Sequence, residues 1–214
     1  MANKEIDNGV EMVKDTPVLG KDVMYFIQST NPEVAPIGSP AVAPAHVTSG
    51  DTSIEGDLTD EQTHMGRILG YSANEDSIDL THYLVPGDKA KDIIIDAKHN
   101  HRQVKVWRVE VDPRLATDEG EGIKAYPAMF GYGVVESVDI SDEDGFSEIE
   151  FTLDIVGKLT DKYDDGTPGT FPLSDKQVAL LNELYGYERP GEKAGEFSST
   201  SAETTTTTTT TTSK

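Results

Sequence analysis

Alternating apolar and polar residues dominate the chain between its two polar ends. The clearest alternation lies in Gly133–Val156, where two alternating runs flank the acidic turn Glu143-Asp144-Gly145. A period of two predicts strands that are buried on one face, and Asp-Gly between two such runs is typical of a hairpin. The residues expected to face the core are Val134, Val138 and Ile140 on the first strand and Ile149, Phe151, Leu153 and Ile155 on the second.

The opposite face of the second strand carries Glu148, Glu150, Thr152 and Asp154. Because successive side chains of a strand point to opposite sides, burial of one face places these residues on the other. We therefore expect an acidic face that meets water or a wet surface.

Three more segments are predicted to be strands. Val18–Gln28 is apolar on both faces, and Asp76–Leu84 alternates. Val104–Val111 changes parity near Trp107, which indicates either a β-bulge or burial on both faces. Thr30–Gly50 has a proline at every fourth position from residue 32 to residue 44. It is expected to be a loop or an edge path, because proline disrupts helices and central strands.

Two segments are predicted to be helices. Asp88 is placed to cap a helix that ends near Asn100, with apolar residues at helical spacing. Ser174 and Gln177 have the spacing of a capping box for a second helix, which Gly186 is expected to end.

Together these elements predict a mainly β fold, either an antiparallel β-sandwich or a partly closed barrel, with one α-helix on its flank. An arm (1–17) precedes the β-sandwich domain (18–172), and a short C-terminal helix with an extension follows (173–197). The last segment (198–214) contains an unbroken threonine run from Thr204 to Thr212. Such a run has no apolar partner and cannot build a core.

Composition excludes several classes of function and of binding site. The chain of 214 residues has 18 lysines and arginines against 39 acidic residues, a formal charge of −21. This charge argues against tight binding of nucleic acid. No cysteine is present, which removes disulfides, thiolate metal sites and cysteine nucleophiles. No apolar run approaches the ~20 residues of a membrane span, and no signal peptide pattern opens the chain, so an acidic soluble protein without membrane contact is expected.

We expect no cofactor, no metal and no catalytic residue. His99 and His101 are two residues apart near a helix end, so they point about 200° apart and cannot share an ion. The acidic segments Asp139–Glu150 and Asp161–Pro172 lack the ligand pattern of an EF-hand. The chain has no nucleophile elbow, no phosphate-binding glycine loop and no zinc protease motif.

Acidic residues are concentrated in one part of the chain. Between Glu110 and Asp165 there are sixteen acidic residues and four basic ones. Two interpretations stay open: an ordinary solvated surface, or a surface that repels a polyanion at close range.

The order and spacing of these elements resemble the major tail tube protein of long, non-contractile-tailed bacteriophages, and the likeness covers most of Val18–Thr160. It is carried by four stretches: Gly20–Ile27, Ser77–Leu80 leading into the first helix, Val104–Trp107 directly after that helix, and the hairpin of Gly131–Val134 with Glu150–Leu159.

The resemblance implies a structural virion protein that is made in the bacterial host cytoplasm. Its hexameric rings would stack into a tube around a continuous inner β-barrel, with the helix outside. Viral DNA would pass through without specific binding, along Glu148, Glu150 and Asp154 as lumen-facing acids. The arm and Leu58–Gly70 would bridge consecutive rings. Tape measure, tail terminator and distal tail or baseplate proteins would be partners.

Some features depart from the family, and other functions stay open. Thr30–Gly50 and Asp112–Tyr126 are long for the family, and the threonine run lies outside its shared core. The alternatives are the inner tube of a contractile tail or secretion device, and a monomeric β-sandwich binding module. An enzyme on a β-scaffold has no motif to support it.

Overall fold

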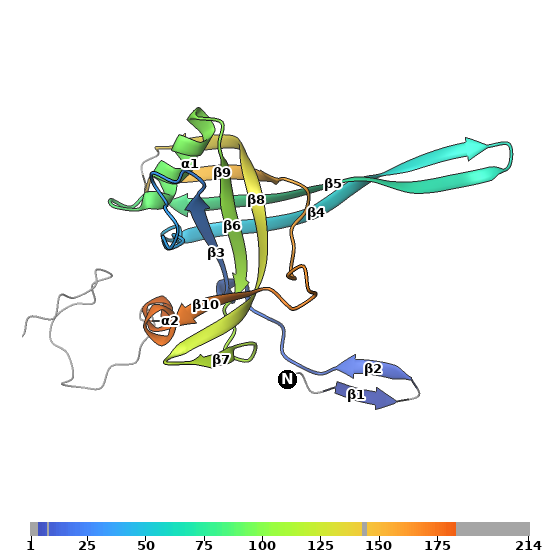
Figure 1. The fold of residues 1–214 in the computed structure, drawn as a ribbon, viewed down its shortest axis with the longest axis horizontal. Coiled ribbons are helices and arrows are strands. Elements are labelled where there is room, and N and C mark those ends of the chain that lie inside the picture. Colours follow the sequence, from blue (N-terminus) through green and yellow to red (C-terminus); the bar gives the residue numbers. More distant parts are fainter. Residues whose placement is uncertain (1–3, 8, 143–144, 183–214) are drawn as a thin grey trace, which may run out of the picture. The chain divides into compact units, whose positions relative to one another are not determined.

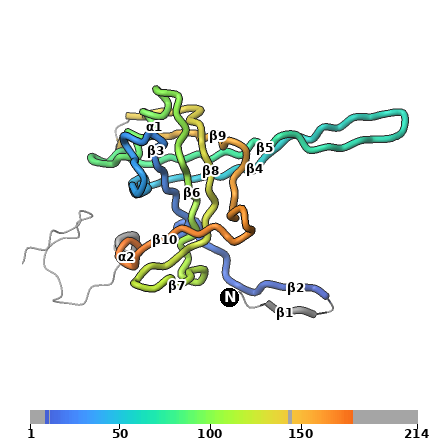
Figure 2. Tube along the Cα trace, viewed as in Figure 1, coloured from blue at the N-terminus to red at the C-terminus, as the bar shows by residue number. Residues whose placement is uncertain are grey.

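The computed structural model describes residues 4–7, 9–142 and 145–182. The chain divides into two compact units, Met1–Leu173 and Ser174–Lys214. The first unit is mainly β (Figures 1 and 2). In chain order the elements are β1 (Lys4–Asp7), β2 (Val10–Val13), the short 3-10 helix η1 (Gly20–Asp22), β3 (Val23–Ser29), β4 (Val47–Thr63), β5 (Gly66–Tyr83), α1 (Lys89–His99), β6 (Gln103–Glu110), β7 (Thr117–Gly120), β8 (Ile123–Ser141), β9 (Glu148–Ile155), β10 (Thr170–Ser174) and α2 (Asp175–Asn182).

The main sheet is antiparallel and has the strand order β3-β6-β8-β9-β5-β4, with β7 and β10 paired to β8 beside this path. β8 is 19 residues long and pairs with β7 at its start, with β6 over Ala128–Val134 and with β9 over Gly133–Ser141. The sheet does not close on itself, so β3 and β4 are its edges. The predicted mainly β class with one flanking helix is confirmed, and all of its strands apart from β1 and β2 form one open antiparallel sheet.

The core lies between α1 and one face of the sheet. Ala90, Ile94 and Ala97 recur at helical spacing and are buried, which gives α1 one apolar stripe. The sheet contributes alternate residues of its strands to the same cluster. Those that are fully buried are Ile27, Ile78, Leu80, Val104, Val106, Ile149, Phe151 and Leu153.

Asp88 caps α1, as predicted. Its Oδ1 accepts a hydrogen bond from the backbone N–H of Ala90 at 2.7 Å, and its Oδ2 accepts one from the N–H of Ala45 at 3.0 Å. The second bond joins the proline-rich loop to the start of the helix.

The change of parity near Trp107 reflects burial on both faces. β6 pairs with β3 and with β8 without a register shift, so it contains no bulge. Val104 and Val106 belong to the core under α1. On the other face, the ring of Trp107 lies 5.2 Å from that of Phe130 and 5.8 Å from that of Phe171 in β10. β10 therefore covers the second face of β6.

The prediction that Val134 faces the core is wrong, because β8 contains a bulge. The register between β8 and β9 shifts between Val135 and Ser137, which reverses the alternation. Val135 is buried, whereas Val134, predicted to face the core, is 45% exposed. Lys98 of α1 satisfies the backbone here, because its Nζ donates to the carbonyls of Val135 (3.1 Å) and Glu136 (2.6 Å).

The hairpin of β4 and β5 is longer than predicted. β5 begins at Gly66 and not at Asp76. β9 pairs with β5 only from Ser77 to Tyr83. The two strands therefore pair only with each other over residues 54–76, called the distal hairpin below, which extends beyond the other strands of the sheet (Figures 1 and 2).

The predicted N-terminal arm contains a small hairpin. β1 and β2 pair with each other in antiparallel fashion. The apolar residues of β2 do not enter a core, because Val10, Met12 and Val13 are each more than half exposed.

The second unit begins with the predicted capping box. The Oε1 of Gln177 accepts from the N–H of Ser174 at 2.8 Å, and the Oγ of Ser174 accepts from the N–H of Gln177 at 3.3 Å. The expected helix end at Gly186 and the threonine run lie outside the described residues, and the boundaries at 17, 172 and 197 stay predictions. No helix in the described ranges is long and apolar enough to cross a bilayer.

Candidate functional site: the acidic face of the sheet

The alternation of β9 separates a buried apolar face from an acidic one. Ile149, Phe151 and Leu153 are 0% exposed. Glu150 and Asp154 are exposed and Glu148 is half-buried on the opposite side. The structure therefore brings the three predicted site residues to one face of one strand.

The neighbouring strands extend this face. In β5, Thr81 lies opposite Glu150 and Ser77 lies opposite Asp154. In β8, Asp139 lies opposite Glu150 on its other side. Opposite residues of an antiparallel pair share a face, so every neighbour of Glu150 in this register is polar or acidic.

Asp79 adds a further carboxylate to the face. It lies opposite Thr152 in the register, and its Oδ1 accepts a hydrogen bond from the Thr152 hydroxyl at 2.5 Å. Asp51 of the edge strand β4 lies opposite Asp79. We define the acidic face by these six carboxylates: Asp51, Asp79, Asp139, Glu148, Glu150 and Asp154.

No basic residue interrupts this surface. The four strand segments that build it, residues 47–53, 76–83, 134–141 and 148–155, contain no lysine and no arginine. Unneutralised carboxylates on a sheet give a negative potential that extends over about one Debye length, roughly 8 Å at physiological salt. The face can therefore repel a polyanion, and its four strand segments offer a polyanion no lysine or arginine.

On the same side of the sheet, the side chains beyond β8 are mainly aromatic instead of acidic. There, Phe26 and Phe171 stack with ring centroids 4.5 Å apart, and Phe130 contacts Tyr132 at 5.2 Å. This half is covered by β10, whereas Glu150 and Asp154 are exposed. The acidic face is thus the open part of the sheet.

Two acids elsewhere in the fold, Asp60 and Asp112, contrast with those of the acidic face because each has an arginine partner. Asp60 accepts hydrogen bonds from both ends of the Arg67 guanidinium at 2.8 and 2.6 Å, and this pairing lowers the pKa of the carboxyl. Hydrogen bonds from the side chain and the backbone of Arg114 lower the pKa of Asp112 to about 2. These acids stabilise local structure, whereas the carboxylates of the acidic face are available to a neighbour.

The histidines and acidic turns do not gather into a metal site in the part of the chain that the structure describes. His82 is fully buried beside Phe151, with ring centroids 6.1 Å apart, so it is a packed core histidine. In the acidic turn after β9, Asp165 accepts hydrogen bonds from Thr167, which lower its pKa and close an ordinary turn.

Sequence reasoning found Glu148, Glu150 and Asp154 but missed the other three carboxylates. Asp79 and Asp51 lie in strands that are far from β9 in the sequence. A signal existed for Asp79, because it alternates with the apolar Ile78 and Leu80 and so had to point away from the core. Only the pairing of the strands shows that it joins β9.

Comparisons with known proteins are consistent across sequence and fold. A family model described as phage tail tube protein matches residues 17–161. The tail tube protein gp17.1 of Bacillus phage SPP1 is 37% identical over 187 residues, which cover 87% of this chain and 65% of that relative. The chain therefore spans slightly less than two thirds of that relative. The hybrid NMR and cryo-EM structure of the SPP1 tail tube matches with a TM-score of 0.55 at 27% identity, over 84% of this chain and 96% of the other.

Proposed function

The chain belongs to the phage tail tube protein family, and from this premise we propose that it forms hexameric rings that stack into a tail tube, a conduit for genome delivery into the host cell. The proteins that it resembles in sequence and in fold are tail tube components. This likeness supports a structural role in the virion, without catalysis.

Open sheet edges support assembly through backbone pairing. An unpaired edge strand presents a row of N–H and C=O groups to another chain. β3 is partly covered, because Ile27 and Val42 exchange two backbone hydrogen bonds of 2.8 and 2.7 Å. The outer edge of β4 is the more open one, so we propose that β4 pairs with the neighbouring subunit in the ring and thereby continues the sheet into a barrel.

The acidic face carries the proposal of a conduit. If the rings close with this face inward, six copies of Glu148, Glu150 and Asp154 form bands of negative charge around the lumen. DNA is itself a polyanion, so it would slide past such bands without adhering. If the same face is turned to the outer solvent, it is an ordinary solvated surface. Lysine substitutions on this face distinguish the two orientations, because only a lumen-facing surface would then retain DNA in the tube.

Two extensions are proposed to connect consecutive rings. The distal hairpin contains the predicted bridging segment Leu58–Gly70, and its Leu58, Leu69 and Tyr71 are all more than half exposed. The arm at residues 1–17 exposes Val10, Met12 and Val13. Apolar side chains exposed on extended segments are typical of surfaces that become buried on assembly.

The remaining partners are proposed from the family. They are a tape measure protein inside the tube, a tail terminator at one end and distal tail or baseplate proteins at the other. Synthesis in the host cytoplasm before assembly into the virion belongs to the same proposal, with no membrane contact and no cofactor.

Electron microscopy of the purified chain tests this function. Negative-stain images over a range of protein concentrations should show rings with sixfold symmetry and tubes of uniform diameter. A chain that stays monomeric at the highest concentration, by microscopy and by analytical ultracentrifugation, would contradict the proposed assembly.

A further inference from the structure

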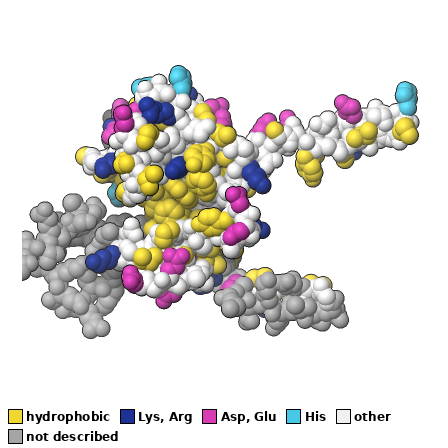
Figure 3. All heavy atoms as spheres, in the orientation of Figure 1, with side chains coloured by type: hydrophobic (Ala, Val, Ile, Leu, Met, Phe, Trp, Pro, Cys, Tyr) yellow, Lys and Arg dark blue, Asp and Glu magenta, His cyan; other side chains and the backbone are white. Residues whose placement is uncertain are grey.

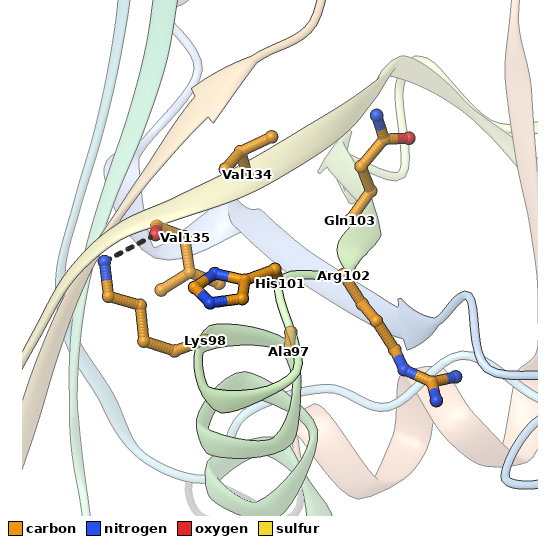
Figure 4. A pocket seen from close by; sticks show the side chains of 7 residues that line it. All are labelled: Ala97, Lys98, His101, Arg102, Gln103, Val134 and Val135. Atoms are coloured by element: carbon orange, nitrogen blue, oxygen red, sulfur yellow. Dashed lines mark hydrogen bonds between the residues drawn. The ribbon is translucent and has the colours of Figure 1, made fainter.

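A basic pocket lies at the C-terminal end of α1 (Figure 4). Its volume is about 260 Å³. The apolar part of its lining is Ala97 of the helix with Val134 and Val135 of the bulged strand β8. The basic part is Lys98, His101 and Arg102, all of which are exposed.

Backbone geometry holds these basic residues in place. The helix ends in a Schellman-type turn, in which the N–H of Arg102 donates to the carbonyl of Ala97 at 2.9 Å. His101 occupies the left-handed position of this turn with φ 52°, where glycine is the usual residue. Lys98 is fixed by its two hydrogen bonds to the bulge in β8. These hydrogen bonds fix the backbone of the pocket and the side chain of Lys98.

Arg102 has no acidic partner in its own chain among the residues that the structure describes. Arg67, Arg108 and Arg114 each hydrogen-bond a carboxylate. The nearby Asp96 is engaged by the side-chain amide of Asn100 at 2.7 Å, and Figure 4 shows the Arg102 guanidinium extended away from Lys98. Arg102 is exposed and unpaired, and it lies beside the apolar lining of the pocket. A matching partner segment would present an acidic side chain next to an apolar one. The chain itself has many acids, with a net charge of −21.

The distal hairpin offers that combination on its surface. Glu61 in β4 lies directly opposite Ile68 in β5. Both are exposed, Ile68 by 60%. The adjacent Asp60 is neutralised by Arg67, which leaves Glu61 as the unpaired acid near the hairpin end. Figure 3 shows acidic and apolar side chains side by side along this hairpin.

We propose that the basic pocket at the end of α1 receives the distal hairpin of a second copy of the chain, with Glu61 against Arg102 and Ile68 against Val134. This inference rests on the proposed function, since it names the contact through which one ring holds the next. Charge complementarity of this kind fixes register and suppresses wrong pairings.

Charge reversal tests the contact in the full chain. Arg102→Glu places two acids against each other and should raise the protein concentration needed for half-maximal tube formation by about tenfold or more. Glu61→Arg should do the same, and the double variant should restore assembly because the pair is reversed. Lys89→Glu changes the same charge at the other end of α1 and is the matched control for Arg102→Glu. Glu75→Arg is the control on the hairpin, and both controls should assemble like the unmodified chain.

Cross-linking gives a second measurement that does not depend on tube formation. The chain has no cysteine, so Arg102→Cys and Glu61→Cys introduce single reactive positions. A mixture of the two variants, treated with a short bismaleimide, should give a covalent dimer that neither variant gives alone. A dimer of equal yield from Lys89→Cys mixed with Glu61→Cys would show unspecific contact and overturn the proposal.

The outcomes separate this inference from the proposed function. Normal tubes from Arg102→Glu, or a failure of the double variant to recover, overturn the pocket contact while tube assembly stands. Rescue of Arg102→Glu by Glu11→Arg instead of Glu61→Arg would assign the pocket to the arm and overturn the hairpin as its occupant. A chain that forms no rings or tubes at all overturns both.

Discussion

At the residue scale, Asp112 and Arg114 connect the loop after β6 to the chain near its N-terminus. Asp112 is 3% exposed and accepts from the Nε and Nη2 of Arg114 at 3.0 and 2.5 Å. The Nη1 of Arg114 donates to the carbonyl of Thr16 at 2.8 Å and lies 3.8 Å from a carboxylate oxygen of Asp15. One arginine thus satisfies a nearly buried acid and fixes the end of the arm.

We predict that this pair makes stability dependent on pH in the acidic range. The pKa of Asp112 falls from 3.8 to about 2 on folding, so its ionised form stabilises the fold above pH 3.8. That contribution is lost as the pH falls from 3.8 towards 2. Urea unfolding at pH 7, 4 and 2.5 should show a smaller decrease for Asp112→Asn, which starts from a lower stability at pH 7. Asp57→Asn, at an exposed acid, is the control, and an equal pH dependence in all three proteins would contradict the assignment.

At the scale of elements, α1 depends on its cap. Asp88 satisfies the N–H of Ala90 and also that of Ala45, so its loss leaves the helix start and the proline-rich loop with unpaired donors. Asp88→Ala should lower the free energy of unfolding by about 2 kcal/mol, which combines a lost cap with a second lost hydrogen bond. Asp88→Asn, which keeps one acceptor, should lose less.

Urea denaturation followed by circular dichroism measures this difference. Asp92→Ala changes an exposed acid in the first turn of the same helix and should stay within about 0.5 kcal/mol of the unmodified chain. If Asp88→Ala is as stable as Asp92→Ala, the cap does not hold the loop to the helix.

At the scale of the whole molecule, the acidic face should decide how the assembled protein treats DNA. Replacement of Glu148, Glu150 and Asp154 by lysine should leave the fold intact. Glu150 and Asp154 are exposed, where substitutions typically change stability by within about 0.5 kcal/mol, and the half-buried Glu148 is the first residue of β9. Tubes of this variant should retain DNA at low salt and release it as salt rises, following counterion release.

A matched variant tests whether DNA retention depends on the position of the new lysines or only on the net charge. Lysine at Glu33, Glu119 and Glu121 changes the same charge at exposed positions away from the acidic face. Filter binding of labelled DNA to both tube preparations should show retention only for the first variant, and genome ejection by phage that carry it should be slower. Equal retention by both variants, or by neither, would place the acidic face outside the channel.

The amino-acid sequence by itself determined those features that depend on neighbours along the chain. The burial of Ile149, Phe151 and Leu153 followed from their alternation with acids, since a strand turns successive side chains to opposite sides. The cap at Asp88 followed equally from local spacing, because a helix start needs an acceptor within the first turn. Strand alternation and helix capping depend on only a few neighbouring residues, so the local sequence pattern is enough to predict them.

Tertiary structure alone decided which segments meet. Val134 points outward because a bulge shifts the register of β8, and the carbonyls at that bulge are satisfied by Lys98 from a helix 37 residues away. Ile140 lies opposite Ile149 in the register yet is 47% exposed. Asp79 joins the acidic face through a bond to Thr152, 73 residues further along. The register of paired strands, and therefore the set of residues that lie on one face, depends on contacts between distant segments. A local sequence pattern does not reveal the free energy of those contacts.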